Sequence, residues 1–423
     1  MWVTYLTVVG EDKVVILDDP EVSLKMRVHL IRTSTKTLDI ATYIYGNDEV
    51  STQMLSELIR AAKRGVKIRM IIDALNNKIP KELSSLLLSL GIRIKLFNAF
   101  SLKKHIHNVT RMHSKITVSD QSVYIVGGRN IVNTYFYIGN QKNFRDREVY
   151  IEGRSGLTAT RAFEELWFSA VVKELKEYRK NKKTLKNIKE ANQFFEAWDT
   201  IPQAKKIEIS KTISRLKFQP ASDVRIIWDR PESYKYVNKN TTNYLIDKIN
   251  SCQSNILIES PYIVFSDDIY KALQSAINRG VKVQIVTNSL ATSDSYLVLA
   301  TYFKERDQLI NLGFDIWEYI SEDEYLHTKM FVFDDKFVTI GSYNLDMLSA
   351  QINTECMVQF IDAELVQQAL GFYKNTKSKA RKAQVNTYIP TLFEDEVTYY
   401  SLKKYAIIKA LQWTVSPYIR EYL

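Results

Sequence analysis

Two short stretches of this chain carry the same reactive side chains at the same spacing. The first reads HSKITVSDQSVYIVGGRN and covers residues 113–130; the second reads HTKMFVFDDKFVTIGSYN and covers residues 327–344. Both follow the pattern H-x-K-x4-D-x6-G-x2-N. A single H-x-K with a later aspartate can arise by chance, whereas two copies that stay in register to the final asparagine indicate a duplicated chemical unit.

The histidine and lysine of each copy are suited to attack on phosphorus. Apolar and β-branched residues follow both pairs, which predicts strands, and alternate side chains of a strand share one face. His113 therefore lies beside Lys115, and His327 beside Lys329. Imidazole can attack a phosphodiester and form a covalent phosphohistidine, while lysine offsets charge on the phosphoryl oxygens. We expect these four residues to be catalytic.

One copy provides half of such a reaction. A second histidine must protonate the leaving oxygen and then deprotonate the incoming acceptor, a role for a group that titrates near neutral pH. The duplication supplies it if the two halves face each other across a pseudo-twofold axis. The sequence therefore predicts one active site shared by both halves of a single, monomeric chain.

The remaining polar positions of the motif have different expected roles. Asn130 and Asn344 follow small residues that let the backbone come close, and their side-chain amides can donate to a phosphoryl oxygen. We therefore predict that they bind phosphate. Asp120 and Asp334 fall on the opposite strand face from the histidines, so we expect them to hold local structure.

The segments around the motifs are repeated as well. In each half a buried strand precedes an amphipathic helix that ends at Arg-Gly and leads into a second apolar strand, which is typical of a parallel sheet with a crossover helix. The strands are expected at 38–45 and 66–72 in the first half, and at 256–262 and 281–285 in the second. Asn47 or Asp48 can cap the first helix, and Asp267 or Asp268 the second.

These repeats predict an α/β fold of two duplicated halves, each with a mostly parallel or mixed sheet flanked by helices. We divide the chain into a first half over 1–170, a basic helical connector over 171–220, a second half over 221–396 and a C-terminal helical tail over 397–423. The basic connector has two interpretations, a solvated helix face or a surface that contacts membrane or nucleic acid.

Composition limits the partners. The 423 residues include 58 Lys and Arg against 48 Asp and Glu, a net charge of +10, which favours anionic surfaces, whether phospholipid or nucleic acid. No apolar run approaches the roughly 20 residues that span a bilayer, and the N-terminus lacks a signal-peptide pattern. We expect a cytoplasmic or peripheral membrane location. Cys252 and Cys356 stand far apart beside apolar residues, which argues against a disulfide framework.

The paired H-x-K-x4-D motif resembles the signature of the phospholipase D superfamily. Within it, the stretches 143–148 (NFRDRE) and 259–263 (ESPYI) resemble the bacterial cardiolipin synthase branch, and the likeness extends over nearly the whole chain from about Lys13. This resemblance implies a phosphatidyltransferase or phospholipase that uses a phosphohistidine and no cofactor.

A catalytic histidine also needs an acceptor that orients its second nitrogen. Glu148 and Glu355 stand in similar strand-like contexts after the two motifs, and the resemblance implies an acidic residue at this place. We therefore predict that they orient the histidines. His105, His107 and His113 do not match a zinc-site spacing, and no cysteine or paired carboxylate joins them, so we predict no metal site.

Three functions remain open at the level of sequence. The first is a cardiolipin synthase-like phosphatidyltransferase or phospholipase acting on phospholipids at an anionic membrane surface. The alternative is a nuclease or other nucleic-acid phosphodiesterase of the same superfamily, which the basic charge equally allows. The third, a scaffold that kept the fold without activity, conflicts with two intact motifs.

Overall fold

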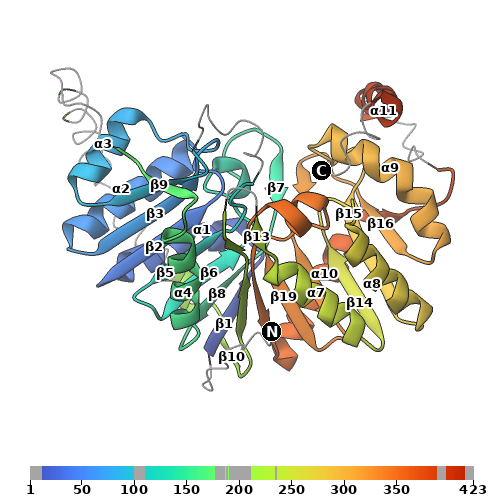
Figure 1. The fold of residues 1–423 in the computed structure, drawn as a ribbon, viewed down its shortest axis with the longest axis horizontal. Coiled ribbons are helices and arrows are strands. Elements are labelled where there is room, and N and C mark those ends of the chain that lie inside the picture. Colours follow the sequence, from blue (N-terminus) through green and yellow to red (C-terminus); the bar gives the residue numbers. More distant parts are fainter. Residues whose placement is uncertain are drawn as a thin grey trace.

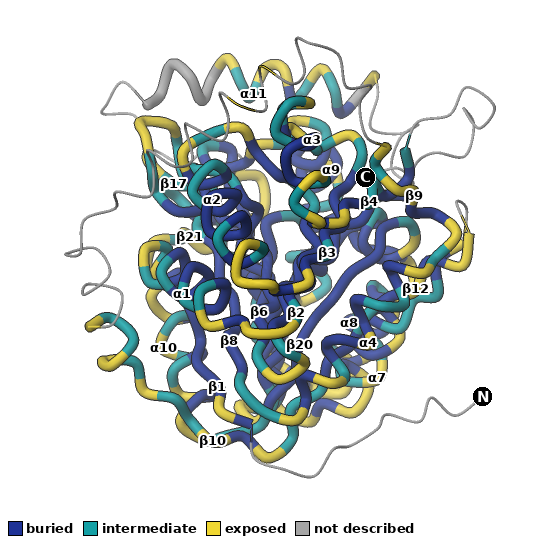
Figure 2. The backbone as a smooth tube through the Cα atoms, turned by 90° about the vertical axis from the view of Figure 1, so that its left-hand side faces the viewer, coloured by how far each residue is buried: buried dark blue, intermediate teal, exposed yellow. Residues whose placement is uncertain are grey.

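The computed structural model describes residues 12–99, 110–176, 186, 189, 211–233, 236–387 and 397–414. Two α/β halves lie side by side, with their sheets meeting along the middle of the molecule (Figure 1). Strands form the buried interior, and the exposed residues gather on the outer helices and loops (Figure 2).

The first half contains a mixed sheet with helices on its faces. Its strands are β1 (Asp12–Leu17), β2 (Thr37–Thr42), β3 (Lys67–Asp73), β4 (Arg93–Phe97), β5 (Ile116–Ser119), β6 (Val123–Gly127), β8 (Glu148–Glu152), β9 (Val172–Glu174) and β10 (Gln219–Ala221). Its helices are α1 (Pro20–Thr33), α2 (Glu49–Lys63), α3 (Lys81–Ser89) and α4 (Gly156–Trp167), with a 3-10 turn at Asn133–Tyr135.

The second half repeats this order of elements. Its sheet contains β11 (Arg225–Trp228), β14 (Asn255–Glu259), β15 (Lys282–Asn288), β16 (Asp315–Tyr319), β18 (Met330–Phe333), β19 (Phe337–Gly341), β20 (Cys356–Phe360) and β21 (Ala380–Lys382), and β12 (Arg230–Pro231) pairs with β13 (Val237–Asn238). Its helices are α7 (Asn240–Ser251), α8 (Asp267–Asn278), α9 (Tyr296–Asn311) and α10 (Ala363–Ser378), with a π-helical turn at Leu348–Ile352.

The strand orders of the two sheets confirm the duplication. In the described residues the first sheet runs β10-β1-β8-β6-β5-β2-β3-β4-β9, and the second runs β11-β20-β19-β18-β14-β15-β16-β21. In both, three neighbouring strands are parallel, and the hairpin that follows the reactive motif joins them antiparallel. The predicted fold class, two α/β halves of one type, is therefore confirmed.

Helix caps explain where the crossover helices begin. The Asp48 carboxylate accepts a hydrogen bond from the Ser51 backbone N–H, and the Ser51 hydroxyl oxygen accepts one from the Asp48 backbone N–H. Asp48, one of the two predicted candidates, therefore caps α2. The predicted cap of α8 is wrong: Ser266 holds that position through Ile269 N, and both Asp267 and Asp268 lie in the first turn. There their negative charges favour the positive end of the helix dipole.

The halves share part of their hydrophobic core. One cluster contains residues of both, including Trp167 of α4 and Val358 of β20. The halves are also connected by a two-stranded parallel sheet, which pairs β7 (Asn143–Arg145) of the first half with β17 (Glu324–Leu326) of the second. Since buried apolar contacts and backbone hydrogen bonds both cross the boundary, the position of one half is tightly coupled to that of the other.

Two strands lie within 171–220, the region predicted as a basic helical connector. β9 and β10 pair at the two edges of the first sheet, so parts of 171–220 belong to that sheet, because their backbone groups complete its edge ladders. Most of 177–210 lies outside the described residues. The four-part division of the chain stays a proposal with this change.

The C-terminal segment forms α11 (Val397–Thr414), which packs on α9 and buries Ile408 completely. Its Lys404 Nζ donates to the Ser293 carbonyl oxygen in the loop before α9. Among the described residues, no helix combines the length and the apolar character that crossing a membrane requires.

Candidate active site

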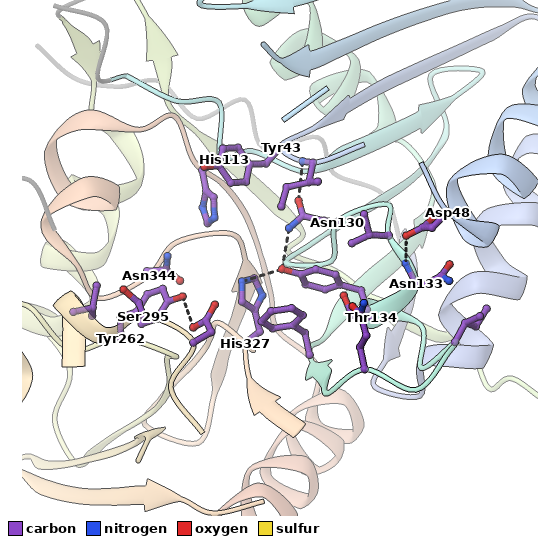
Figure 3. A pocket seen from close by; sticks show the side chains of 18 of the residues that line it. Tyr43, Asp48, His113, Asn130, Asn133, Thr134, Tyr262, Ser295, His327 and Asn344 are labelled. Carbon is purple, nitrogen blue, oxygen red and sulfur yellow. Dashed lines mark hydrogen bonds between the residues drawn. The ribbon is translucent and has the colours of Figure 1, made fainter. Parts of the chain in front are cut away.

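The two predicted histidines face one cavity from opposite halves. His113 precedes β5 and His327 precedes β18, and both line a cavity of about 730 Å3 (Figure 3). Both residues are almost buried, with relative exposures of 8% and 6%. The first half also contributes Tyr43, Asp48, Asn130, Asn133 and Tyr135, and the second half Tyr262, Asp294, Ser295, Asn344 and Asp346.

Each histidine is held by the opposite half. The His113 backbone N–H donates to the Thr354 carbonyl oxygen over 3.0 Å, and the His327 N–H donates to that of Arg145 over 2.8 Å. The side chains repeat the exchange: His113 Nδ1 lies 2.9 Å from a Glu355 carboxylate oxygen, and His327 Nδ1 lies 2.6 Å from Asp146 Oδ2. Neither pair can form within one half.

The structure contradicts the prediction that Glu148 orients a histidine. Its buried carboxylate instead forms an ion pair with Arg27 and accepts a hydrogen bond from Ser23. The strand pairing explains the error, since Gly127 pairs with Glu148 whereas its counterpart Gly341 pairs with Met357. The residue equivalent to Glu355 is therefore Asp146, two positions earlier, and a shift of two keeps the same strand face.

The carboxylates fix the tautomer of the histidines. Burial raises the pKa of Asp146, but Lys329 and His327 outweigh it and hold the pKa below its ordinary value. Burial likewise raises the pKa of Glu355, and His113 and Lys115 reverse the shift. An ionised carboxylate accepts the proton on Nδ1, which leaves the lone pair of Nε2 for chemistry in the cavity.

Both imidazoles are neutral in this arrangement. Burial lowers the pKa of His113. Burial and the neighbouring Lys329 lower the pKa of His327 to about 4. At neutral pH each Nε2 therefore carries a lone pair, and that of His327 accepts a hydrogen bond from the Tyr135 hydroxyl over 3.3 Å.

The two lysines lie beneath the histidines. Lys115 Nζ donates to the His113 carbonyl oxygen over 2.6 Å, and Lys329 Nζ donates to the His327 carbonyl oxygen. Burial is the main cause that lowers the pKa of Lys115 to about 7 and that of Lys329 to about 8. An anionic phosphodiester would favour their charged forms, because an opposite charge nearby raises the pKa of an amine.

The two motif asparagines have different surroundings. Asn130 Oδ1 accepts the Ile44 backbone N–H, and its Nδ2 donates to the Tyr135 hydroxyl over 2.9 Å. Asn344 Oδ1 is buried without a hydrogen-bond donor among the described residues. Both line the cavity, and their binding of phosphate stays a prediction.

The motif aspartates lie in tight turns away from the cavity. Asp120 accepts from the backbone N–H groups of Thr35, Lys36 and Thr37, and Asp334 from those of Gln253 and Ser254. Both have positive φ, 51° and 53°, a conformation that aspartate tolerates better than most residues. Each carboxylate ties the hairpin after the motif to the start of the neighbouring strand.

Sequence reasoning missed Tyr135 and Asp146, which contact His327. Tyr135 follows the first motif, but the matching place in the second copy holds Ser349, so the duplication gives no signal for it. Asp146 could have been found by aligning the strands after the two glycines. His105 and His107 lie outside the described residues, and within the described part no group of three His, Cys, Asp or Glu could hold a metal ion.

Comparisons with known proteins agree with this architecture. The family model described as "Cardiolipin synthase, PLD-like domain" matches residues 28–167 and 245–376, one stretch in each half. The cardiolipin synthase C of Escherichia coli is 29% identical over 386 residues, which cover 81% of either chain. An uncharacterized protein of Helicobacter pylori is 29% identical over 392 residues, 82% of this chain and 75% of that protein.

Among solved structures, the phosphatidylserine synthase of Haemophilus influenzae superposes with a TM-score of 0.68. The match covers 97% of this chain and 95% of the other at 15% sequence identity. At this identity the likeness shows a common fold of two halves.

Proposed function

Because this chain belongs to the family of cardiolipin synthase PLD-like proteins, we propose that it is a phosphatidyltransferase or phospholipase that works through a covalent phosphohistidine. The observation that carries the proposal is the reciprocal pairing of His113 with Glu355 and of His327 with Asp146 around one cavity. Each pair leaves an Nε2 lone pair available, which suits one histidine to attack and the other to manage the proton.

The reaction has two steps. In the first, Nε2 of one histidine forms a bond to the substrate phosphorus while the bond from phosphorus to the head-group oxygen breaks. The other histidine enters this step as an imidazolium, because the bound anionic phosphodiester raises its pKa, and it gives its Nε2 proton to the departing oxygen. In the second, that histidine removes a proton from water or an alcohol, whose oxygen bonds to phosphorus while the bond from phosphorus to the first histidine breaks. Lys115 and Lys329 offset the phosphoryl charge, and Glu355 and Asp146 stabilise each imidazolium that forms.

The side chains around the cavity favour a lipid over a nucleic acid. Of the described residues that line it, none is Lys or Arg, whereas Asp48, Asp294 and Asp346 are carboxylates. A nuclease must also hold the phosphates that flank the cleaved one, and such contacts come from basic side chains. Phosphatidylglycerol presents a single phosphodiester, which the buried histidines and lysines can serve.

The test is to identify the product. Purified protein is incubated with phosphatidylglycerol vesicles, with and without a primary alcohol other than glycerol, such as 1-butanol, and the lipids are identified by mass spectrometry. We expect phosphatidic acid in water and a phosphatidyl-alcohol that grows at its expense when alcohol is added, since both acceptors consume one intermediate. EDTA should leave turnover unchanged, because the proposed mechanism needs no metal.

The competing function is tested in parallel with single- and double-stranded DNA. Cleavage of DNA by the wild type but not by His113→Ala, with no lipid product under any condition, would overturn the proposal and support the nuclease. Loss of turnover in EDTA that added zinc or magnesium restores would overturn the metal-free mechanism.

A further inference from the structure

The outward face of α11 is apolar and basic. Ile407 is 42% exposed, and Ala406, Ala410 and Lys403 are exposed beside it at spacings of three and four residues, so they share one side of the helix. The opposite side packs on α9 and buries Ile408. The sequence of α11 contains lysines but neither aspartate nor glutamate. Exposed apolar side chains beside lysines are typical of a helix that lies in a membrane interface.

This helix lies lengthwise across one end of the molecule. Figure 2 shows α11 along the top, with β1 and β10 at the bottom. In Figure 1 the same helix lies outside α9, toward the end of the molecule that also contains β7. A helix placed in this way can present its whole length to a flat surface.

The rim of the active-site cavity is joined to α11 through one loop. Asp294 lies in the loop before α9 and lines the cavity. The Lys404 Nζ of α11 donates to the Ser293 carbonyl oxygen of that loop over 2.5 Å. The same Nζ lies 5.2 Å from the centre of the Tyr296 ring, in the first turn of α9. A surface that contacts α11 therefore also comes close to the cavity.

A second lysine binds the same loop from the other half. Lys142 Nζ donates to the Ala291 carbonyl oxygen over 3.2 Å. Burial and then the charge of Lys142 lower the pKa of Lys404 to about 8, whereas Asp294 acts in the opposite direction. The two amines are thus close enough to repel each other, and anionic lipid head groups would relieve that repulsion.

Exposed apolar side chains lie on both sides of the cavity. Tyr296 of the second half is 44% exposed, and Leu75 of the first half is 57% exposed. Leu75 follows the carboxyl end of β3, which is parallel to β2. It therefore lies at the edge of the sheet from which Tyr43, after β2, contributes to the cavity.

We propose that α11, together with Leu75, Lys142 and Tyr296, forms the surface by which this protein docks on an anionic phospholipid bilayer. In this arrangement α11 lies in the plane of the head groups, with Ile407 toward the acyl chains. The inference rests on the proposed function and adds how the cavity reaches its lipid: docking brings the loop before α9 to the head groups, so a phosphodiester can enter the cavity while its acyl chains stay in the bilayer.

The experiment is co-sedimentation with vesicles, in the His113→Ala background so that the lipids stay intact. One set of vesicles is phosphatidylcholine mixed with phosphatidylglycerol, and the other is phosphatidylcholine alone. We expect binding to the anionic vesicles to be at least about tenfold tighter, because each lysine near an anionic surface contributes roughly a fivefold factor. The difference should shrink as salt rises, since salt screens exposed charges.

Two variants change the outward face of α11. Lys403→Glu and Ile407→Asp should each weaken binding to the anionic vesicles about tenfold or more. Lys67→Glu, at the start of β3, and Leu157→Asp, in the first turn of α4, make the same changes at the ends of their elements away from the cavity. Both control positions are exposed and should leave binding nearly unchanged. Thermal unfolding verifies that each variant is folded.

Turnover of a water-soluble substrate separates docking from catalysis. Short-chain phosphatidylglycerol below its critical micelle concentration is dissolved as single molecules and needs no docking. With His113 intact, Lys403→Glu and Ile407→Asp should therefore turn it over at the wild-type rate, and should lose activity only on vesicles.

Each outcome decides between these functions of the surface. Unchanged vesicle binding in both α11 variants, equal losses in their controls, or no binding by the parent protein would overturn the docking surface even if lipid products form. The expected losses of binding without any lipid product would support the docking surface and contradict the proposed reaction. A dimer in sedimentation velocity that Ile407→Asp dissociates, with vesicle binding unaffected, would assign this face to a second copy of the chain and refute the inference.

Discussion

Each histidine in this site depends on a carboxylate from the other half of the chain. The His–carboxylate distances of 2.9 and 2.6 Å are hydrogen bonds, and both carboxylates are fully buried. Low local dielectric strengthens such contacts and makes a missing partner costly. The mechanism therefore predicts distinct results for changes to the histidines and to the acids that orient them.

At His113 and His327 we predict that substitution with alanine abolishes turnover in each case. The two groups serve one reaction and cannot replace each other, so the loss should exceed about a thousandfold. His29→Ala, on α1 and outside the cavity, is the matched control and should keep near wild-type activity. Steady-state lipid turnover measures all three, and more than about a tenth of wild-type activity in either mutant would refute the paired mechanism.

The acids at 146 and 148 should behave differently. Asp146→Asn removes the acceptor of His327 Nδ1 and should lower kcat about a hundredfold or more, because the wrong tautomer is then favoured. Asp146→Glu should restore part of the activity and of the wild-type pH profile. Glu148→Gln should instead lower the free energy of unfolding by about 3 kcal/mol, since it leaves Arg27 buried without its ion pair.

Kinetics and urea unfolding of the same variants distinguish these roles. A larger loss of kcat in Glu148→Gln than in Asp146→Asn, at equal stability, would return the orienting role to Glu148.

Asp346 should impose a pH dependence on stability. Burial raises its pKa in the folded protein to about 7, against about 3.9 in an unfolded chain. At a pH between these two pKa values, Asp346 binds more protons in the folded state than in the unfolded state. The contribution of Asp346 to the free energy of unfolding therefore falls as pH rises. The Tm of the wild type minus that of Asp346→Asn should therefore decrease from about pH 4 to 7 and then level off; an increase over this range would contradict it.

At the scale of elements, close strand contacts position the reactive segments. A Cβ on Gly127 of β6 would lie 2.7 Å from the Glu148 Cα, and one on Gly341 of β19 would lie 2.6 Å from the Met357 Cα. Both clashes are with the backbone of the strand that follows the orienting acid. The glycines therefore set how close that acid comes to the histidine of the other half.

Gly127→Ala and Gly341→Ala should each lower the free energy of unfolding by about 1–3 kcal/mol, because the neighbouring backbone must shift to admit the methyl group. Gly371→Ala is the control in α10, where a Cβ would meet nothing within 4 Å. That change should raise stability by about 0.5–1 kcal/mol through helix propensity. Thermal or urea unfolding measures all three, and unchanged stability at Gly127 and Gly341 would contradict the close approach.

At the scale of the whole molecule, the two halves are parts of one reaction centre. The β7–β17 pairing, the mixed hydrophobic cluster and the exchanged carboxylates all join them. A chain that contains both motifs should therefore have one complete site.

Mixing His113→Ala and His327→Ala proteins should give no recovery of activity. Each chain then lacks one of the two groups that a single cavity needs, and folded chains do not exchange halves during an assay. Lipid turnover of the equimolar mixture, compared with the wild type diluted to the same concentration, is the measurement. Recovery would indicate a site built between two chains and would overturn the expectation of a monomer.

The sequence by itself determined the features that repeat. Two copies of one motif, each followed by apolar residues of strand type, predicted the duplicated α/β fold and the four reactive residues. These features depend on local spacing and on alternation along a strand, both of which can be read without knowing how distant segments meet. In the structure His113 and His327 line one cavity, and Lys115 and Lys329 lie beneath them.

Only the tertiary structure decided which acid serves which histidine. Asp146 and Glu148 share a strand face, so periodicity could not separate them; the pairing of β6 with β8 did. The duplication gives no signal for the contact of Tyr135 with His327 or for the unpaired Oδ1 of Asn344, because each of these features occurs in only one half. Contacts across the boundary between halves depend on how the two sheets pack, and that packing is set by buried side chains throughout both halves.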